Sequence, residues 1–520
     1  MSSPPHALVL PWPLQSHIIP LMHLSHFLAD NGFKITFVNT EDNHDRIVSA
    51  GAHADRFRMI SIPNGLGPEE QQFDTRMIDA IEYNMPSQLE NLIRKINEEG
   101  MDKITVLIAE TGMGWAMGVA ERLKLRSVAF CPTSATFLAT WLNIPKLRET
   151  GVIDENGSPK IKEIFKLAPT MKPIDETYFA WNFVQNIEIR QRMFRHFENN
   201  VQYILKAPFI LCNSFQDFEL PIFTNFPNII PLGPLPLGKS SNPAGHLWSD
   251  DPTSIDWLDQ QSVNSVVYVA FGSIATLDQN QVEEFAFALD SSKMHFLWVI
   301  RSDQTMGEHH DFLKQFQESI NRRGKGKIVN WCNQEKVLAH PSIACFVSHC
   351  GWNSTMDGVK NGMPFLCLPY LADQFAVRDY LCDVVNVGLS LVRNENGVVT
   401  REEIKSKLIE LLQSEEIKLR ARRIKELAER SISPGGSSFQ NLYNLVENLK
   451  KTIWMMFTIY NYFENQEPKD PDNFMAFLKH YLFPTVVLRP LRPPPPPWSP
   501  PTSSVVWPLG GLETLLFTCA

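Results

Sequence analysis

Short apolar runs alternate along this chain with longer segments in which apolar residues recur every three or four positions. In the first half, the runs that predict β-strands lie at residues 7–10, 35–38, 57–62, 104–109, 127–130 and 209–212. In the second half they lie at residues 266–271, 295–299, 327–329, 344–347 and 365–368. Strands that alternate with helices are typical of a parallel sheet covered by helices. The pattern therefore predicts an α/β protein.

A stretch rich in proline, glycine and serine at residues 231–245 separates the two sets of strands. This composition is typical of a connection between domains. We therefore predict two doubly wound, Rossmann-like domains facing across a cleft, so that the carboxyl ends of both sets of strands meet one ligand. The predicted segments are a first domain (1–235), a linker (236–252), a second domain (253–435) and a last helix (436–452).

Residues 453–520 differ from the rest of the chain. They combine an aromatic run at 454–463 with a proline run at 493–497 and a late apolar piece. Such composition favours a disordered tail. A regulatory or partner-binding arm that uses the polyproline run is the alternative.

The composition adds limits to the class of protein. The 520 residues include 44% hydrophobic and 20% charged residues, as in ordinary globular proteins. A net charge of -9 argues against a nucleic-acid partner. Cysteines are scattered without paired spacing, which favours a reducing compartment. Pro11 and Pro13 interrupt the first apolar stretch, and no apolar run approaches the ~20 residues of a membrane span. We therefore expect a cytoplasmic monomer without a signal peptide.

The segment 331–374 carries the clearest chemistry. Its predicted strand at 344–347 ends in a turn of small residues that contains His349, and a helix follows through Asn361. A helix start presents free backbone N–H groups to an anion, and an imidazole there can add another donor. Trp331 offers a flat face for a base, and Asp373 and Gln374 are suited to grip sugar hydroxyls. Base, diphosphate and sugar together indicate a nucleotide sugar.

A second group of candidate residues follows strands of the first half. His17 comes after the strand 7–10 and before a helix predicted from about Ile18, and Glu110 ends the strand 104–109. Both should lie at the same edge of the sheet, where a carboxylate can orient an imidazole that acts as a general base. Glu110 as a simple cap of the next helix is the alternative. His23 and His26 lie too far along the helix to form a metal site with His17.

The segment 331–374 resembles the signature box of the plant family 1 UDP-glycosyltransferases. The resemblance rests on the length of the segment, Trp331, Gln334, the His-Cys-Gly-Trp-Asn-Ser core at 349–354 and the closing Asp373-Gln374, and it extends over residues 6–450. It implies the GT-B fold, with the acceptor pocket mainly in the first domain and the donor site in the second. It also implies that the last helix crosses back onto the first domain.

The resemblance assigns roles residue by residue. His17 corresponds to the family's base, and Glu110 stands where the family has an aspartate. Around the donor, the residues expected to bind are Ser273, Trp331, Cys332, Gln334, His349, Trp352, Asn353, Ser354, Asp357, Asp373 and Gln374, with Thr133 as a weaker sugar contact. Gln374 corresponds to the glutamine that goes with glucose donors, and Asp357 stands where the family has a ribose-binding glutamate. No metal and no cofactor are implied, because UDP-glucose is a co-substrate.

These observations predict an inverting UDP-glucosyltransferase that acts on a hydroxyl or carboxyl of a small hydrophobic plant metabolite. Because Glu110 and Asp357 depart from the family pattern, a catalytically impaired UDP-sugar-binding paralogue is the alternative. Gly112, Gly114 and Gly118 suggest an NAD-dependent oxidoreductase, but their spacing does not fit G-x-G-x-x-G.

Overall fold

The protein is described from a computed structural model. The described residues are 4–49, 58–67, 75–100, 102–160, 166–167, 171, 178–179, 181–182, 186–235, 248, 250–275, 277–301 and 308–450. Most of the predicted linker (236–247 and 249) and the whole predicted tail (453–520) lie outside these residues.

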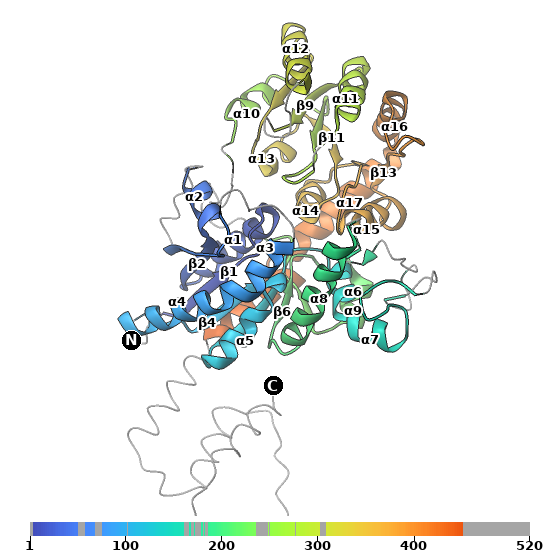
Figure 1. The fold of residues 1–520 in the computed structure, drawn as a ribbon. Helices are drawn as coiled ribbons and strands as arrows, with labels where there is room; N and C mark the ends of the chain where they lie inside the picture. The colour runs from blue at the N-terminus through green and yellow to red at the C-terminus, as the bar shows by residue number, and fades with distance from the viewer. Residues whose placement is uncertain are drawn as a thin grey trace, which may run out of the picture. The chain divides into compact units, whose positions relative to one another are not determined.

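The described residues of the first half form a seven-stranded parallel sheet in the order β3-β2-β1-β4-β5-β6-β7 (Figure 1). Its strands are β1 (His6–Leu10), β2 (Lys34–Thr40), β3 (Arg58–Ile62), β4 (Val106–Glu110), β5 (Arg126–Cys131), β6 (Ile210–Cys212) and β7 (Ile229–Pro231). The helical elements are α1 (Gln15–Asp30), α2 (Glu41–Ser49), α3 (Thr75–Asp79), the π-helix η2 (Ala80–Asn84), α4 (Met85–Glu99), the 3₁₀ turn η3 (Thr111–Met113), α5 (Trp115–Arg122), α6 (Ala135–Leu142), α7 (Ile144–Glu149), α8 (Ile187–Ile204) and α9 (Leu220–Asn225).

The described residues of the second half form a six-stranded parallel sheet in the order β10-β9-β8-β11-β12-β13. Its strands are β8 (Val266–Ala270), β9 (His295–Val299), β10 (Gly326–Val329), β11 (Ile343–Ser348), β12 (Phe365–Cys367) and β13 (Gly388–Ser390). The helical elements are α10 (Thr253–Leu258), α11 (Gln279–Ser291), α12 (Glu308–Arg322), α13 (Gln334–Leu338), α14 (Trp352–Lys360), α15 (Gln374–Asp379), the π-helix η6 (Tyr380–Val384), α16 (Arg401–Gln413) and α17 (Glu415–Ile432).

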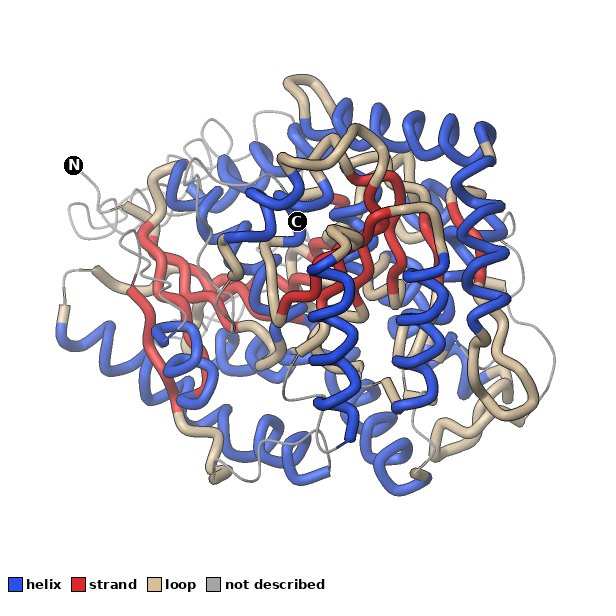
Figure 2. The backbone as a smooth tube through the Cα atoms, turned by 90° about the horizontal axis from the view of Figure 1, so that it is seen from above, coloured by secondary structure: helices blue, strands red, loops and turns tan. Residues whose placement is uncertain are grey.

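The strands are buried between two layers of helices, as Figure 2 shows with strands in red and helices in blue. In β1, Leu8 and Leu10 belong to the core shared with α4, α5 and α8, whereas Ala7 and Val9 belong to the core shared with α1. The same alternation holds in β8. A strand that is buried on both faces needs apolar residues at every position. This explains why the sequence shows continuous apolar runs, and it confirms the predicted fold class of two doubly wound sheets.

The last described segment returns to the first sheet. Residues 437–450 are helical. Leu442, Leu445, Val446 and Leu449 pack in the same core as β1 and α1.

Three details differ from the sequence-based expectation. β7 and β13 were not expected, because three residues that include proline or glycine give no readable pattern. Helix α1 begins at Gln15 rather than near Ile18, because the carbonyl of Leu14 accepts hydrogen bonds from the backbone N–H groups of His17 (2.9 Å) and Ile18 (3.0 Å). His17 therefore lies inside the first turn of the helix, not before it.

Candidate active site

Each sheet has one point at which the strand order reverses. In the first sheet this point lies between β1 and β4, and in the second between β8 and β11. In doubly wound folds, ligands bind beside the carboxyl ends of the strands at such a point. His17 follows β1 and Glu110 ends β4, while Ser273 follows β8 and His349 follows β11. The candidate residues of both halves thus lie where the topology opens a crevice.

One cavity of about 810 Å³ is lined by residues of both sheets. Every candidate residue from the sequence borders it: His17, Glu110, Thr133, Ser273, Trp331, Cys332, Gln334, His349, Trp352, Asn353, Ser354, Asp357, Asp373 and Gln374. The fold therefore brings together residues that lie more than 350 positions apart in the chain.

His17 and Glu110 form a pair at the first reversal point. His17 Nδ1 lies 3.6 Å from Glu110 Oε2, and the exposed fractions of the two side chains are 23% and 3%. This distance exceeds that of a hydrogen bond. Contacts at catalytic dyads are often long before substrate binds. The carboxylate is thus placed to orient the imidazole.

Glu110 also caps the turn that follows it. Its Oε2 accepts a hydrogen bond from the backbone N–H of Gly112 (2.9 Å), and its Oε1 accepts one from Thr111 Oγ1 (2.8 Å). These bonds fix the carboxylate, because they hold both oxygens to the start of η3. Glu110 therefore caps η3 while its carboxylate lies beside the ring of His17.

The glycines after Glu110 have a packing reason. A Cβ atom at Gly112 would lie 2.7 Å from Glu110 Oε2, and one at Gly114 would lie 2.6 Å from Asn200 Oδ1. Both positions require glycine because neighbouring side chains approach the backbone closely. This removes the reason for assigning them to a dinucleotide fingerprint.

Helix α14 presents a positive end to the cavity. Its N-cap is Gly351, and no side chain caps it. The first N–H groups of a helix lack partners within the helix and carry partial positive charge. Gly351, Trp352, Asn353 and Ser354 all border the cavity. The arrangement suits a diphosphate.

His349 is enclosed beside this helix start. Burial lowers its pKa to about 4, although a hydrogen bond with the backbone of Ala270 opposes the shift. The ring is therefore neutral near pH 7. Its Nε2 atom would lie 2.4 Å from a Cβ atom at either Gly272 or Gly351, so both glycines are needed to accommodate it. Gly272 also has a φ of +76°, which favours glycine.

Trp331 belongs to an aromatic and cationic stack. Its ring centroid lies 4.8 Å from that of Trp248, at an interplanar angle of 34°. The guanidinium groups of Arg301 and Arg46 lie 4.8 Å and 5.0 Å from the Trp248 ring. Trp331 borders the cavity. This stack supports one side of the ring while the cavity adjoins it.

Gln334 joins two other candidate residues. Its Nε2 donates to Ser354 Oγ and to Asp357 Oδ2, both at 2.9 Å. Burial and the negative charge of Glu335 raise the pKa of Asp357 to about 6, against the effects of Lys360 and Gln334. Asn333, which the sequence analysis did not select, caps α13 by accepting from the backbone N–H of Lys336. Gln334 is thereby fixed at the first position of a helix.

Asp373 and Gln374 also border the cavity. Burial raises the pKa of Asp373 to about 7, with His17 opposing and Glu219 adding to the shift. Gln374 Oε1 accepts hydrogen bonds from the backbone N–H groups of Tyr370 (2.8 Å) and Leu371 (3.1 Å). The amide oxygen of Gln374 is therefore used by the turn, and its N–H donors are the groups that can meet a sugar hydroxyl.

Trp352 and Asn353, at the start of α14, form hydrogen bonds with residues of the first half of the chain. Trp352 Nε1 donates to the carbonyl of Asn213 at 2.7 Å, and Asn353 Nδ2 donates to the carbonyl of Ser16. Asn213 Nδ2 also donates to Asn353 Oδ1 at 3.3 Å. The indole N–H of Trp352 is thus already bonded, so any contact of this residue with a sugar has to use its backbone or ring. These bonds link α14 to the residue that follows β6 and to α1, the helix that carries His17.

Cys332 and Thr133 are the remaining candidates, and their side chains contact neighbouring hydroxyl and thiol groups of the protein. Cys332 Sγ lies 3.6 Å from the hydroxyl of Tyr268, and burial raises the pKa of its thiol to about 12. Thr133 Oγ1 lies 3.2 Å from Cys131 Sγ. Both residues border the cavity.

Sequence reasoning missed the wall of the cavity in the first half. It consists of aromatic and apolar residues from three segments, the loop after β1 and the helices α6 and α8: Trp12, Leu14, Phe137, Trp141, Met193, His196 and Phe197. No local motif marks them, because each belongs to an ordinary apolar segment. His23 also borders the cavity. Among the residues that the structure describes, no three His, Cys, Asp or Glu side chains are grouped to hold a metal ion.

Within the described part of the chain, no helix is both long enough and apolar enough to cross a bilayer.

A family model, two relatives and a solved structure that match this chain are all described as glycosyltransferases or glucosyltransferases. A family model described as "UDP-glucoronosyl and UDP-glucosyl transferase" matches residues 181–430. UDP-glycosyltransferase 83A1 of Arabidopsis thaliana is 36% identical over 465 residues, covering 86% of this chain and 97% of the relative. A 7-deoxyloganetin glucosyltransferase of Catharanthus roseus is 31% identical, with the same coverage. A UDP-glucosyltransferase from Polygonum tinctorium, solved in complex with 3,4-dichloroaniline, superimposes with a TM-score of 0.72 at 25% identity and covers 86% of this chain and 99% of that one.

Proposed function

Because the chain belongs to the plant family 1 UDP-glycosyltransferases, we propose that it transfers glucose from UDP-glucose to a small hydrophobic plant metabolite. The acceptor group is a hydroxyl or carboxyl, and the acceptor is of a phenolic, flavonoid, terpenoid or hormone-like kind. We further propose that the enzyme is a cytoplasmic monomer that needs no metal and no cofactor. Transfer of a sugar from a UDP-sugar to a small acceptor is the activity of this family of GT-B enzymes.

The observation that carries this proposal is that one cavity borders the points at which the strand order reverses in both sheets. It adjoins the His17–Glu110 pair on one side and the uncapped N-terminus of α14 on the other. A transferase of this kind needs a base near the acceptor and an anion site near the leaving group. Both features border the same cavity.

The proposed reaction uses His17 as the general base. With Nδ1 directed to Glu110, Nε2 is the nitrogen that takes the proton from the acceptor hydroxyl. The acceptor oxygen then attacks C1 of the glucose from the side opposite to UDP, so that a new C1–O bond forms as the bond to the diphosphate breaks. UDP leaves with the electron pair, and the α-linked donor yields a β-glucoside. Glu110 stabilises the imidazolium that results.

Charge on the departing UDP is met by the protein. The N–H groups at the start of α14 and the side chains of Ser273, Asn353 and Ser354 surround the proposed diphosphate position. Preorganised donors of this type stabilise charge that develops in the transition state. Neutral His349 has a single ring N–H, which reaches the diphosphate only if it leaves its hydrogen bond with the backbone of Ala270.

The remaining donor contacts follow from the same placement. Trp331 stacks on uracil, Gln334 and Asp357 meet the uridine, and Asp373 with the N–H groups of Gln374 holds the glucose. The acceptor lies against the aromatic wall of the first half. Its large apolar area suits a hydrophobic acceptor rather than a sugar or a peptide.

The test is product formation with UDP-glucose and a panel of phenols and plant metabolites, followed by mass spectrometry. We expect a mass increase of one hexose in the wild type and none in His17→Ala, while both proteins bind UDP in calorimetry. An impaired paralogue would instead bind UDP with wild type and variant equally inert. UDP-galactose is the matched donor control, and equal rates with both sugars would reject the assignment of glucose.

A further inference from the structure

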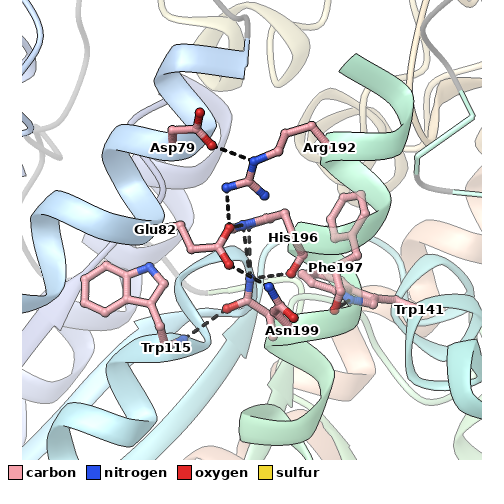
Figure 3. Close-up of polar contacts among 9 residues, drawn as sticks. Asp79, Glu82, Trp115, Trp141, Arg192, His196, Phe197 and Asn199 are labelled. Atoms are coloured by element: carbon pink, nitrogen blue, oxygen red, sulfur yellow. Dashed lines mark hydrogen bonds and ion pairs between the residues drawn. The ribbon is translucent and has the colours of Figure 1, made fainter. Parts of the chain in front are cut away.

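A cluster of charged and polar residues joins α3 and the π-helix η2 to α8, close to Trp141 and Phe197 (Figure 3). Trp141 and Phe197 border the cavity. Glu82 Oε2 accepts a hydrogen bond from Arg192 Nη2 at 2.6 Å, and Glu82 Oε1 accepts one from Asn199 Nδ2 at 2.7 Å. Asp79 Oδ1 accepts from Arg192 Nε at 2.6 Å. These bonds tie α3 and the π-helix η2 to α8. Single-turn π-helices are frequent at functional sites.

His196 on α8 is part of the same cluster. Its Nδ1 lies 3.5 Å from Glu82 Oε2, and its Nε2 lies 3.1 Å from Asn200 Nδ2. The same Asn200 nitrogen also lies 3.3 Å from Nδ1 and donates to the backbone carbonyl of His196 at 2.8 Å. Both ring nitrogens therefore have polar neighbours within the protein.

Glu82 is ionised at neutral pH. Burial by itself raises its pKa, but hydrogen bonds from His196, Arg192 and Asn199 outweigh that effect and lower the pKa to about 2. The guanidinium of Arg192 pairs with Glu82 and with Asp79, so one positive charge serves two carboxylates. The cluster is thus an ionic clamp on α8 at neutral pH.

The clamp lies behind the face of α8 that borders the cavity. Met193, His196 and Phe197 line that cavity, and the His196 ring meets Trp12 edge to face at a centroid distance of 5.2 Å. Trp141 also lines the cavity, but its indole N–H donates to the carbonyl of Phe197 at 2.8 Å. The nitrogens of His196 and Trp141 in this wall therefore have partners within the protein, and the carbon atoms of these two rings remain to face a ligand.

We propose that Glu82 is a positioning residue that keeps the α8 wall of the cavity apolar, because it engages a ring nitrogen of His196 and the guanidinium of Arg192, so that neither polar group is offered to the acceptor. The enzyme then selects acceptors whose body carries no polar group on the side opposite the reacting hydroxyl. The inference rests on the proposed function only in treating this part of the cavity as the acceptor site. Glu82 itself does not line the cavity.

The test compares binding of two probes by calorimetry in the presence of UDP. 2-Naphthol has one hydroxyl, and 2,6-dihydroxynaphthalene adds a second at the opposite end. A hydroxyl buried against carbon without a partner is costly. We expect the wild type to bind 2-naphthol about tenfold more tightly, after correction for the two equivalent hydroxyls of the diol.

Glu82→Gln should reduce this preference to about twofold. A glutamine offers one oxygen where Arg192, His196 and Asn199 need two, so at least one polar group loses its partner and can turn to the diol. Glu90→Gln is the matched control. Glu90 also accepts from Arg94 (2.7 Å) and Arg122 (3.0 Å), but none of these residues lines the cavity. We expect Glu90→Gln to keep the wild-type preference.

Equal preferences in Glu82→Gln, Glu90→Gln and wild type would overturn the inference, as would a wild type that binds the diol as tightly as 2-naphthol. If Glu82→Gln does not fold, Asn199→Ala removes one bond to Glu82 from an exposed position and should weaken the preference in the same direction. An unchanged preference in that variant would count against the clamp. Because the readout is binding, a wild type that shows the preference but transfers no sugar would reject the proposed function and leave the inference standing.

Discussion

Replacing Glu110 by Gln tests the His17–Glu110 pair, because it removes the charge and keeps the shape. At the observed 3.6 Å, two unit charges interact by about 4–5 kcal/mol for an effective dielectric constant of ~20. His17 is partly exposed, so solvent screening reduces the effective stabilisation of the imidazolium to roughly 3–4 kcal/mol. We therefore expect kcat to fall about 10²- to 10³-fold.

The assay is the initial rate of UDP release with UDP-glucose and a phenolic acceptor. The KM for UDP-glucose should stay within about twofold of wild type, because Glu110 is expected to act in the transition state and not on the donor. Glutamine can still accept from the backbone N–H of Gly112, so the η3 turn should persist and the melting temperature should change little. Glu110→Asp is the companion variant. We expect it to keep or raise kcat, since aspartate is the family's residue at this position.

A loss of less than about fivefold in Glu110→Gln would refute the reasoning. Glu110 would then be only the cap of η3, which its bonds to Thr111 and Gly112 also allow. A hundredfold loss in Glu110→Asp would instead show that the longer side chain is fitted to this site.

Three further predictions concern the donor side. Asp357→Glu should lower the KM for UDP-glucose about two- to fivefold, because one methylene extends the carboxylate toward the ribose; an unchanged KM would remove the ribose assignment. Gly272→Ala should lower both the melting temperature and the affinity for UDP. The φ of +76° at this position costs alanine about 1–2 kcal/mol, and the new Cβ atom would lie 2.4 Å from His349 Nε2. Thermal melts and UDP calorimetry equal to those of the wild type would contradict this prediction. Asp373→Asn should raise the melting temperature at pH 8 but not at pH 4. Because the pKa of Asp373 is raised to about 7 in the folded state, the folded protein holds the proton more tightly than the unfolded chain does. The free energy of unfolding therefore falls as the pH rises from about 4 to 7, and asparagine does not share this loss. The same change in melting temperature at both pH values would show that ionisation of Asp373 is not the cause.

Much of the fold could be predicted because its signals are local. Each strand that was expected from a continuous apolar run is present, and the missed β7 and β13 are three-residue strands at sheet edges. The start of α1 was placed too late because its N-cap, Leu14, has no side chain that caps. Most of the candidate donor residues could be named because they lie within the contiguous segment 331–374, whereas Ser273 and Thr133 lie outside it. Their placement around the cavity agrees with that expectation, whereas their roles remain predictions.

The wall opposite the donor could not be predicted, for a different reason. Trp12, Trp141 and His196 come from segments far apart in the chain, and each reads as an ordinary apolar or helical residue. Nothing in the sequence pairs Glu82 with Arg192 across more than a hundred positions. Likewise, no pattern indicates that Asn353 bonds to Ser16 or that the indole N–H of Trp352 is already used.

The sequence by itself thus determined the class of fold and most of the candidate donor residues that border the cavity, since burial on both faces of a strand and a continuous motif leave marks in consecutive residues. Only the tertiary structure decided which strands are neighbours at each reversal point, which side chains of the first half line the cavity and which of their polar atoms are already bonded. Those features depend on partners brought together from distant positions, and hydrogen bonds between such partners leave no periodicity in the chain.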